Sequence, residues 1–382
     1  MEPKILITDG LWRKSLVAVR SLGKSEADVT VTGTNIFTTS FYSRYCRHRL
    51  LTPDPNNNPQ AFAQFIIKKL QQTKYDLLIP MEDATIKALL PFRKQIEELT
   101  HFPLPATQTL EIAFDKQQTL SLARKLGIPT PIEYSNFSSA VFPVVAKLKS
   151  SSGSRGLRYL NSLSDLKKFP ELENNSQNYL IQEKLPTESE EVGVNFLYNS
   201  VHQPIASFTY RRLRDYPVSG GPSTLRESTH NSQILKLGQK LLDNLSWTGV
   251  AMVEFKYDPK SKQYKLMEIN PRFWGSLALP VASGINFPKL LLDMVTTKNF
   301  HPTLSYPDNI KARWLIPGDI LHFLSNPNRF HLKPGFFEFF DKNTFYDDFD
   351  SSDPSGNLAV IFCTLIQALN PRLWPLVFRK NK

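Results

Sequence analysis

The sequence predicts an α/β and α+β protein, with a parallel α/β domain at the N-terminus and a larger region of antiparallel sheets behind it. Strand-like and helix-like segments alternate over the first 110 residues, beginning with "KILIT", and such alternation is typical of a parallel sheet. From Asp115 the strands "FPVVAKLK", "YLIQEKL", "EVGVNFLY" and "IASFTYRRL" predict mostly antiparallel pairing. The last part of the chain is rich in proline and aromatic residues and shows weaker periodicity. The predicted domains are therefore 1–110, 111–300 and a C-terminal extension, 301–382.

Composition and charge narrow the class of protein. The chain has 382 residues, of which 41% are hydrophobic and 21% charged, so a globular protein of two or three domains is expected. Its two cysteines, Cys46 and Cys363, exclude a disulfide framework and fit the reducing cytoplasm. Neither a signal peptide nor a membrane-spanning helix is expected. The net charge of +11 indicates anionic partners, but no basic block with interleaved aromatic residues points to nucleic acid.

The segment "KLMEINPRFWGS" places charged and amide side chains on a strand that otherwise looks buried. With "VAMVEFKYD" before it and a polar turn between, it predicts a hairpin, and pairing Asp258 with Tyr264 sets Glu254 opposite Glu268. Asn270 then shares a face with Glu268. Opposed carboxylates repel unless a cation lies between them, and carboxylate and amide oxygens suit Mg²⁺ shared with phosphate. A solvent-facing polar stripe is the alternative interpretation.

The segment "FPVVAKLKSSSGSRG" has the features of a phosphate-binding loop. Lys147 ends an apolar strand, and the loop behind it contains Ser152, Gly153 and Ser154. Glycine lets the backbone approach a ligand closely, and successive N–H groups can hold phosphate. An ordinary turn is the alternative, but a lysine on the preceding strand favours phosphate.

A third segment, "YLIQEKLPTESEEVGVNFL", leads an apolar strand into Glu183, Lys184 and Leu185. Its backbone edge suits an adenine ring, and a carboxylate such as Glu191 suits ribose hydroxyls. A strand that enters an acidic surface loop is the alternative.

Taken in order, these segments resemble the ATP-grasp superfamily, and most of all its carbamoyl-phosphate-synthase-like carboxylate–amine ligases. The resemblance is carried from about residue 1 to 300 by Lys116, Lys147, "SSSGSRG", "QEKL", Glu191, "MVEF" and "MEINPR". It implies a pre-ATP-grasp domain followed by the ATP-grasp fold. It also implies that the two lysines contact the phosphates of ATP beneath a mobile "SSSGSRG" loop.

The same resemblance implies further ligand contacts. The backbone of Glu183 and Leu185 would hold adenine and Glu191 the ribose, although the spacing leaves Glu190 as a rival for the ribose. One Mg²⁺ would be bound by Glu254 with Glu268, and a second shared by Glu268 with Asn270; Mn²⁺ is an alternative ion.

Arginines gather in "YRRLRDYPVSGGPSTLRES", where Arg211, Arg212, Arg214 and Arg226 surround a Gly-Gly turn. A solvated charged face is one interpretation. A loop that closes over an anionic substrate is the other, because arginine matches carboxylate and phosphate geometry, and related carboxylate–amine ligases carry a similar stretch. Arg226 is the preferred candidate there. Arg272, next to the predicted metal ligands, is expected to stabilise charge on the transferred phosphoryl group.

The expected activity is ATP-dependent ligation. A carboxylate would attack the γ-phosphate of ATP, and an amine, an amino acid in the family expectation, would displace phosphate from the acyl phosphate. The alternatives are an ATP-binding regulatory or scaffolding module without turnover, and an ATP-grasp kinase or carboxylase with another acceptor. A homodimer is compatible with the sequence.

The C-terminal segment "NLAVIFCTLIQALNPRLWPLVFRKNK" joins an apolar helix-length stretch to several cations. Weak peripheral contact with an anionic membrane is one interpretation. Packing of residues 358–369 against the ATP-grasp core is the favoured one.

Overall fold

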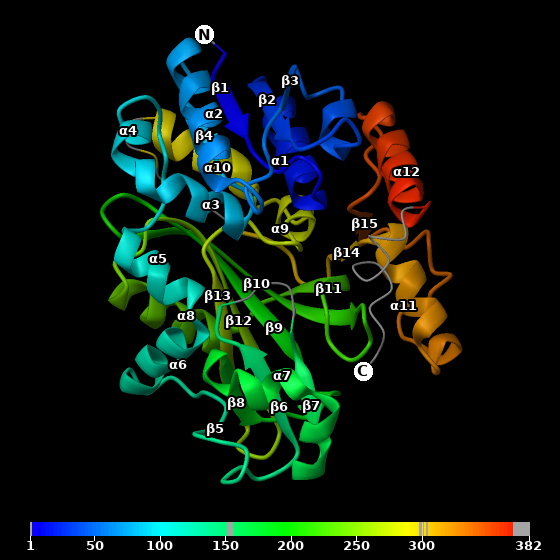
Figure 1. Ribbon diagram of the computed structural model, residues 1–382. Coiled ribbons are helices and arrows are strands. Elements are labelled where there is room, and N and C mark those ends of the chain that lie inside the picture. Colours follow the sequence, from blue (N-terminus) through cyan, green and yellow to red (C-terminus); the bar gives the residue numbers. More distant parts are fainter. Residues whose placement is uncertain (1, 151–155, 298–299, 301, 303–304, 370–382) are drawn as a thin grey trace.

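A computed structural model describes residues 2–150, 156–297, 300, 302 and 305–369. Its N-terminal part is a four-stranded parallel sheet in the order β3-β2-β1-β4, which confirms the predicted α/β alternation (Figure 1). The strands are β1 (Lys4–Ile7), β2 (Asp28–Gly33), β3 (His48–Leu51) and β4 (Leu77–Ile79). Alternate residues of β1 point to opposite faces. Ile5 and Ile7 therefore pack with α1 (Arg13–Lys24), while Leu6 packs with α2 (Pro59–Gln72) and α3 (Asp83–Leu89).

The middle of the chain forms two further sheets. A seven-stranded sheet has the order β13-β12-β9-β10-β11-β14-β15, and a four-stranded sheet has the order β5-β8-β6-β7. All their pairings are antiparallel except that of β14 with β15, as predicted for this region. The large sheet consists of β9 (Glu191–Tyr198), β10 (Pro204–Asp215), β11 (Ser223–Thr229), β12 (Gly249–Asp258), β13 (Gln263–Asn270), β14 (Lys311–Arg313) and β15 (Thr344–Tyr346). The small sheet consists of β5 (Glu133–Tyr134), β6 (Val144–Leu148), β7 (Arg158–Leu160) and β8 (Tyr179–Glu183).

Helices pack on both of these sheets. One apolar cluster joins the large sheet to α5 (Thr107–Phe114), α6 (Lys116–Lys125) and α8 (Ser232–Asn244), with Phe196, Val253 and Trp247 fully buried in it. Short α4 (Arg93–Glu97) follows the N-terminal sheet, and α7 (Pro170–Asn174) packs on the small one. Within the described residues, no helix is long and apolar enough to cross a bilayer.

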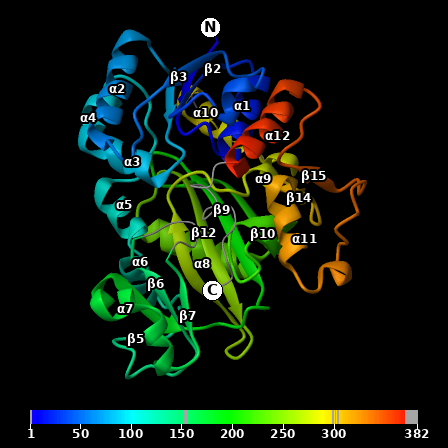
Figure 2. The ribbon, with the colours of Figure 1, turned by 45° about the vertical axis from the view of Figure 1, so that its right-hand side comes forward.

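The chain after the hairpin returns to the N-terminal sheet. Helices α9 (Ala278–Ala282) and α10 (Phe287–Thr296) contact α1 and share its apolar cluster (Figure 2). Next come β14, η5 (Leu315–Asp319), α11 (Ile320–Ser325), η6 (Arg329–His331), β15 and α12 (Pro354–Leu369). Helix α12 packs mainly on η1 (Thr39–Tyr42) of the N-terminal part. Packing of this segment is thus confirmed, but its main partner is the N-terminal domain rather than the expected ATP-grasp core.

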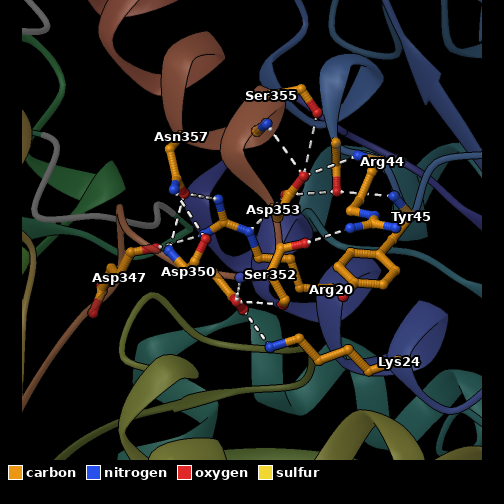
Figure 3. A network of polar contacts seen from close by, with 12 residues as sticks. Arg20, Lys24, Arg44, Tyr45, Asp347, Asp350, Ser352, Asp353, Ser355 and Asn357 are labelled. Carbon is orange, nitrogen blue, oxygen red and sulfur yellow. Dashed lines mark hydrogen bonds and ion pairs between the residues drawn. The ribbon is translucent and has the colours of Figure 1, made fainter.

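Buried polar contacts tie the extension to the N-terminal domain (Figure 3). Asp353 accepts hydrogen bonds from Arg20 Nε at 2.9 Å, Ser43 Oγ at 2.8 Å and the Arg44 backbone N–H at 2.9 Å. Burial alone would raise the pKa of Asp353, but these donors outweigh it and hold the pKa below its usual value. The carboxylate is fully buried, and a buried charge is tolerated only where such partners satisfy it. At the surface nearby, Lys24 lies 2.5 Å from Asp350.

Candidate active site

A polar cleft of about 140 Å³, partly open to solvent, lies between the small and the large sheet. Its walls come from α6, β6, β7, β8, β9, β10, β12 and β13, and the turn after β10 also lines it. The charged lining residues are Lys116, Lys147, Glu183, Lys184, Glu191, Arg212, Glu254, Lys256 and Glu268. Most of the predicted nucleotide and metal residues therefore meet in one place.

The predicted carboxylate pair is present on the hairpin. Glu254 and Glu268 are directly opposite in the β12–β13 register, and Asn270 Nδ2 donates to Glu268 Oε1 at 3.1 Å. The assumed pairing of Asp258 with Tyr264 is wrong by one residue, because Asp258 pairs with Gln263. A bulge between Glu254 and its neighbour restores the expected partner.

That bulge also changes which side chains reach the cleft. Glu254 opposes Glu268, whereas Phe255 opposes Leu266, so Met267 is the extra residue on β13. Met267 and Glu268 both line the cleft. A strictly alternating strand would send these two neighbours to opposite faces.

Three cations surround the carboxylate pair. Lys116 Nζ lies 3.3 Å from Glu268 Oε2, and Arg212 Nη2 lies 2.7 Å from Glu254 Oε1. Lys147, at the end of β6, faces the same cleft. Burial lowers the pKa of Lys147 to about 8, although Glu268 opposes the shift. Burial likewise raises the pKa of Glu254 to about 7, with Arg212 acting against it.

Arg212 reaches Glu254 across a glycine. In the register of β12, β9 and β10, Glu254 lies opposite Gly193, and Gly193 lies opposite Tyr210. A Cβ on Gly193 would fall 2.5 Å from the Tyr210 ring, so this position has no room for a side chain. The Tyr210 ring fills the space over Gly193, and Arg212, two residues further along β10 and so on the same face of the sheet, extends to Glu254.

Arg212 also anchors the predicted ribose carboxylate. Glu191 opens β9 and lies between Arg212 Nη1 at 3.1 Å and Lys256 Nζ at 2.9 Å. Glu190, its rival, accepts instead from the Tyr264 hydroxyl at 2.8 Å and does not line the cleft. Burial would raise the pKa of Glu191, but the two cations outweigh it and lower that pKa.

The segment predicted to hold adenine ends β8 at one end of the cleft. Glu183, Lys184 and Leu185 all line it. The Glu183 carboxylate is engaged elsewhere, because it lies 2.5 Å from Lys265 Nζ and accepts from the Ile132 backbone N–H at 2.8 Å. The predicted loop residues Ser152, Gly153 and Ser154 lie outside the described residues.

The two arginines predicted to act in catalysis lie apart from the described cleft lining. Arg226 is fully buried, and its Nη2 lies 2.5 Å from Asp347 of the extension. Arg272 directs its Nε to Asp83 of the N-terminal domain at 2.7 Å. Burial would lower the pKa of Arg272, but Asp83 outweighs it and raises that pKa.

Sequence reasoning passed over Arg212 in favour of Arg226. The two residues are cross-strand partners in the β10–β11 register, so they share a face of the sheet. Which of them reaches the cleft depends on the extension, because Asp347 covers Arg226 while Glu191 and Glu254 hold Arg212. No local sequence signal distinguishes them.

The donor set at the hairpin fits Mg²⁺ shared with a phosphate ligand. Two opposed carboxylates and an amide provide hard oxygen donors, while Mg²⁺ usually takes only one or two protein carboxylates together with substrate oxygens. In the described part of the chain, no group of three or more His, Cys, Asp and Glu side chains is arranged to hold a metal alone. The arrangement thus suits an ion that arrives with its nucleotide.

Comparisons with known proteins agree with this geometry. The family profile described as "ATP-grasp in the biosynthetic pathway with Ter operon" matches residues 176–315. The chain is 23% identical over 251 residues to a carbamoyl-phosphate synthase of Methanobrevibacter smithii, covering 58% of this chain and 64% of that protein. It is 24% identical over 237 residues to a D-alanine–D-alanine ligase of Aquifex aeolicus, covering 56% of this chain and 78% of that protein.

The fold has a solved counterpart. The biotin carboxylase domain of the Hydrogenobacter thermophilus 2-oxoglutarate carboxylase, a dimer in complex with MgADP, ADP and bicarbonate, superposes with a TM-score of 0.65 at 12% identity. The alignment covers 81% of this chain and 73% of that one. This likeness shows a shared fold, and the family profile together with the paired carboxylates of the β12–β13 hairpin supports the resemblance to the ATP-grasp superfamily.

Proposed function

We propose that the protein is an ATP-dependent carboxylate–amine ligase that forms an amide or peptide bond and releases ADP and phosphate. The observation that carries the proposal is the pair Glu254 and Glu268, opposed on one hairpin and flanked by Lys116, Lys147 and Arg212 within a single cleft. Opposed carboxylates inside a ring of cations suit a polyphosphate with its divalent ion.

In this proposal the nucleotide lies along the cleft. The backbone of Glu183 and Leu185 binds adenine, and Glu191 binds the ribose hydroxyls. Lys116 and Lys147 contact the phosphates, and Ser152, Gly153 and Ser154, which lie outside the described residues, are proposed to bind the phosphates as well. Mg²⁺, proposed as two ions, would be held by Glu254, Glu268 and Asn270, and when bound it would neutralise charge on the β- and γ-phosphates.

The protein residues contribute position and charge to the reaction. The substrate carboxylate oxygen attacks the γ-phosphorus, and the bond from that phosphorus to the β-phosphate oxygen breaks. The amine nitrogen then attacks the acyl carbon and loses a proton, and phosphate leaves with one oxygen of the original carboxylate. Such a transfer requires alignment and charge neutralisation more than covalent help from side chains.

We assign Arg212 the role of a cation beside the transferred phosphoryl group, because it lies in the cleft and contacts Glu254 at 2.7 Å. Arg272 is proposed as a positioning residue, since it follows Asn270 closely and fixes the hairpin to Asp83. Arg226, initially proposed as a substrate ligand, is now assigned to holding the extension through Asp347.

The substrates are proposed as a small-molecule carboxylate and an amine, with an amino acid as the amine. The D-alanine–D-alanine ligase among the relatives supports this choice by its name. The cytoplasm is the proposed site of action, where both buried free cysteines remain reduced. A homodimer is proposed by analogy with the dimeric structural neighbour.

The test is Mg²⁺-dependent release of ADP and phosphate from ATP in the presence of pooled carboxylates and pooled amino acids. The proposal expects release that requires both pools and is lost in Glu268→Gln. Release without an amine favours a kinase or carboxylase-type reaction. ATP binding without turnover in every combination favours a regulatory module.

A further inference from the structure

Helix α12 carries an apolar surface that the fold leaves uncovered. None of its sixteen residues is charged. Its inner face, with Ala359, Val360 and Cys363 buried, packs on the N-terminal domain. Of its exposed large side chains, the most exposed are Leu358 (68% exposed), Phe362 (54%), Leu365 (58%) and Leu369 (80%). These residues recur every three or four positions and so form one stripe along the helix.

The stripe borders a groove of about 790 Å³ between α12 and the segment that follows η1. The groove is lined on one side by Tyr42, Ser43, Arg44, Cys46 and Arg49, and on the helix side by Ser355, Leu358, Ala359, Ile361, Phe362 and Leu365. Ile36 and Phe37 extend the apolar area, since both are exposed and the Phe37 ring lies 6.5 Å from that of Phe362. We name Leu358, Phe362, Leu365 and Leu369, with Arg44 and Arg49, the α12 surface.

Arginines set the charge of this surface. Arg44 and Arg49 are exposed, and neither forms an ion pair within the described part of the chain. Their guanidinium groups lie over the rings of Tyr45 and Tyr42, at 5.8 and 5.3 Å. The nearby carboxylate of Asp353 is already satisfied by Arg20, Ser43 and the Arg44 backbone. The rim therefore attracts an anion.

We infer that the α12 surface docks on a lipid bilayer with anionic headgroups. Exposed leucine and phenylalanine side chains beside cations suit the boundary between acyl chains and anionic headgroups. A second copy of the chain fits less well, because face-to-face pairing would bring the unpaired arginines of both copies together. The sequence beyond Leu369 adds four cations and no acid, although those residues lie outside the described part and are not assigned to the surface.

The test uses the full-length protein and two kinds of vesicle, one of phosphatidylcholine alone and one of phosphatidylglycerol mixed with phosphatidylcholine. The protein is expected to co-sediment with the anionic vesicles at low salt and to be largely released at about 0.5 M salt, where charge attraction is screened. Phe362→Ser with Leu365→Ser should lower the partition coefficient by at least about tenfold, because two apolar side chains no longer insert. Arg44→Gln with Arg49→Gln should lower binding to the anionic vesicles only.

A matched control replaces two exposed apolar residues elsewhere, Val141→Ser with Val201→Ser, which are 71% and 65% exposed. This control should bind vesicles like the unmodified protein, and thermal unfolding should show that all variants are folded. The inference is overturned if the unmodified protein does not bind anionic vesicles, or if the Phe362 and Leu365 changes leave binding intact. It is also overturned if sedimentation equilibrium shows a dimer that these changes dissociate while no vesicle binding occurs, since a second copy would then cover the surface.

Discussion

Arg212 on β10 and Glu254 on β12 form an ion pair at 2.7 Å although the whole strand β9 lies between them. The register sets Glu254 opposite Gly193 of β9, whose missing side chain leaves room for the Tyr210 ring of β10, and Arg212 extends from the same face of β10 to Glu254. A second contact joins Arg212 to Glu191 of β9 at 3.1 Å. One arginine thus connects the proposed ribose carboxylate to a proposed metal ligand, which makes it the cation most closely tied to the chemistry.

Replacing Arg212 should impair catalysis more than binding of the amine substrate. Arg212→Gln removes the charge next to Glu254, and a loss of about 10²- to 10³-fold in kcat is expected, as for other preorganised charge-stabilising groups. Arg212→Lys should recover part of the rate, because it keeps the charge but not the forked geometry. Steady-state ADP release measures both, and a Gln variant with undiminished kcat would contradict the assignment.

Replacing Arg226 should affect stability instead. Among the described residues, Arg226→Met leaves the buried carboxylate of Asp347 with Arg13, 3.5 Å away, as its ion-pair partner, so the free energy of unfolding should fall by about 3–5 kcal/mol. The double variant Arg226→Met with Asp347→Leu lacks both charges and should recover most of the lost free energy of unfolding. Urea unfolding of the two variants measures this. A single variant as stable as the unmodified protein would show that the contact with the extension is not needed.

Gly193 should tolerate no side chain. A Cβ there would lie 2.5 Å from the Tyr210 ring, and this ring is buried and cannot move freely. Gly193→Ala should therefore shift β10 relative to β9 and lower both stability and turnover, with about 1–3 kcal/mol lost from the free energy of unfolding. Adding Tyr210→Leu should recover part of the stability by removing the clash. Equal losses in the single and double variants would be inconsistent with this contact.

Asp348 should make the protein less stable as the pH rises. Burial, together with the neighbouring Asp347, raises the pKa of Asp348 to about 7 from its ordinary value of 3.8. The folded state therefore binds this proton more tightly than the unfolded state, and stability should fall between about pH 4 and 7, by at most about 1.4 kcal/mol per pH unit. Below that window the contribution is fully present.

Asp348→Asn should weaken the fall in stability with rising pH, because the amide cannot ionise. Its oxygen can still accept the hydrogen bond that the Ile316 backbone N–H donates to Asp348 at 2.8 Å in the unmodified protein. Urea unfolding at pH 5 and pH 8 measures how strongly the free energy of unfolding depends on pH in each of the two proteins. Parallel slopes would show that Asp348 does not titrate in this range.

Local sequence patterns were sufficient to predict the parts of the molecule whose contacts are close in sequence. The alternation of strands and helices predicted the parallel sheet, and the hairpin predicted that Glu254 faces Glu268, although the bulge at Met267 was needed to bring them into register. The choice between Arg212 and Arg226 could not be made in this way. It depends on Asp347, which lies 121 residues beyond Arg226 in sequence and reaches it only after the extension has joined the sheet.

The contacts of the C-terminal extension likewise could not be predicted from local sequence patterns. Its weak periodicity suggested an appendage, whereas β14 and β15 complete the large sheet and Asp353 enters the N-terminal domain. Short strands of three residues carry little pattern of their own, and their pairing is decided by distant partners such as β11.

The most direct test of the proposed chemistry measures the transfer of a carboxylate oxygen to phosphate rather than a reaction rate. Once the pooled assay has identified a carboxylate substrate, that substrate is labelled with ¹⁸O, and the phosphate released with Mg²⁺, ATP and the amine is examined by mass spectrometry. Ligation through an acyl phosphate predicts one ¹⁸O atom in each phosphate released, with none formed by Glu268→Gln. Phosphate without label, released while the amide forms, would contradict the account.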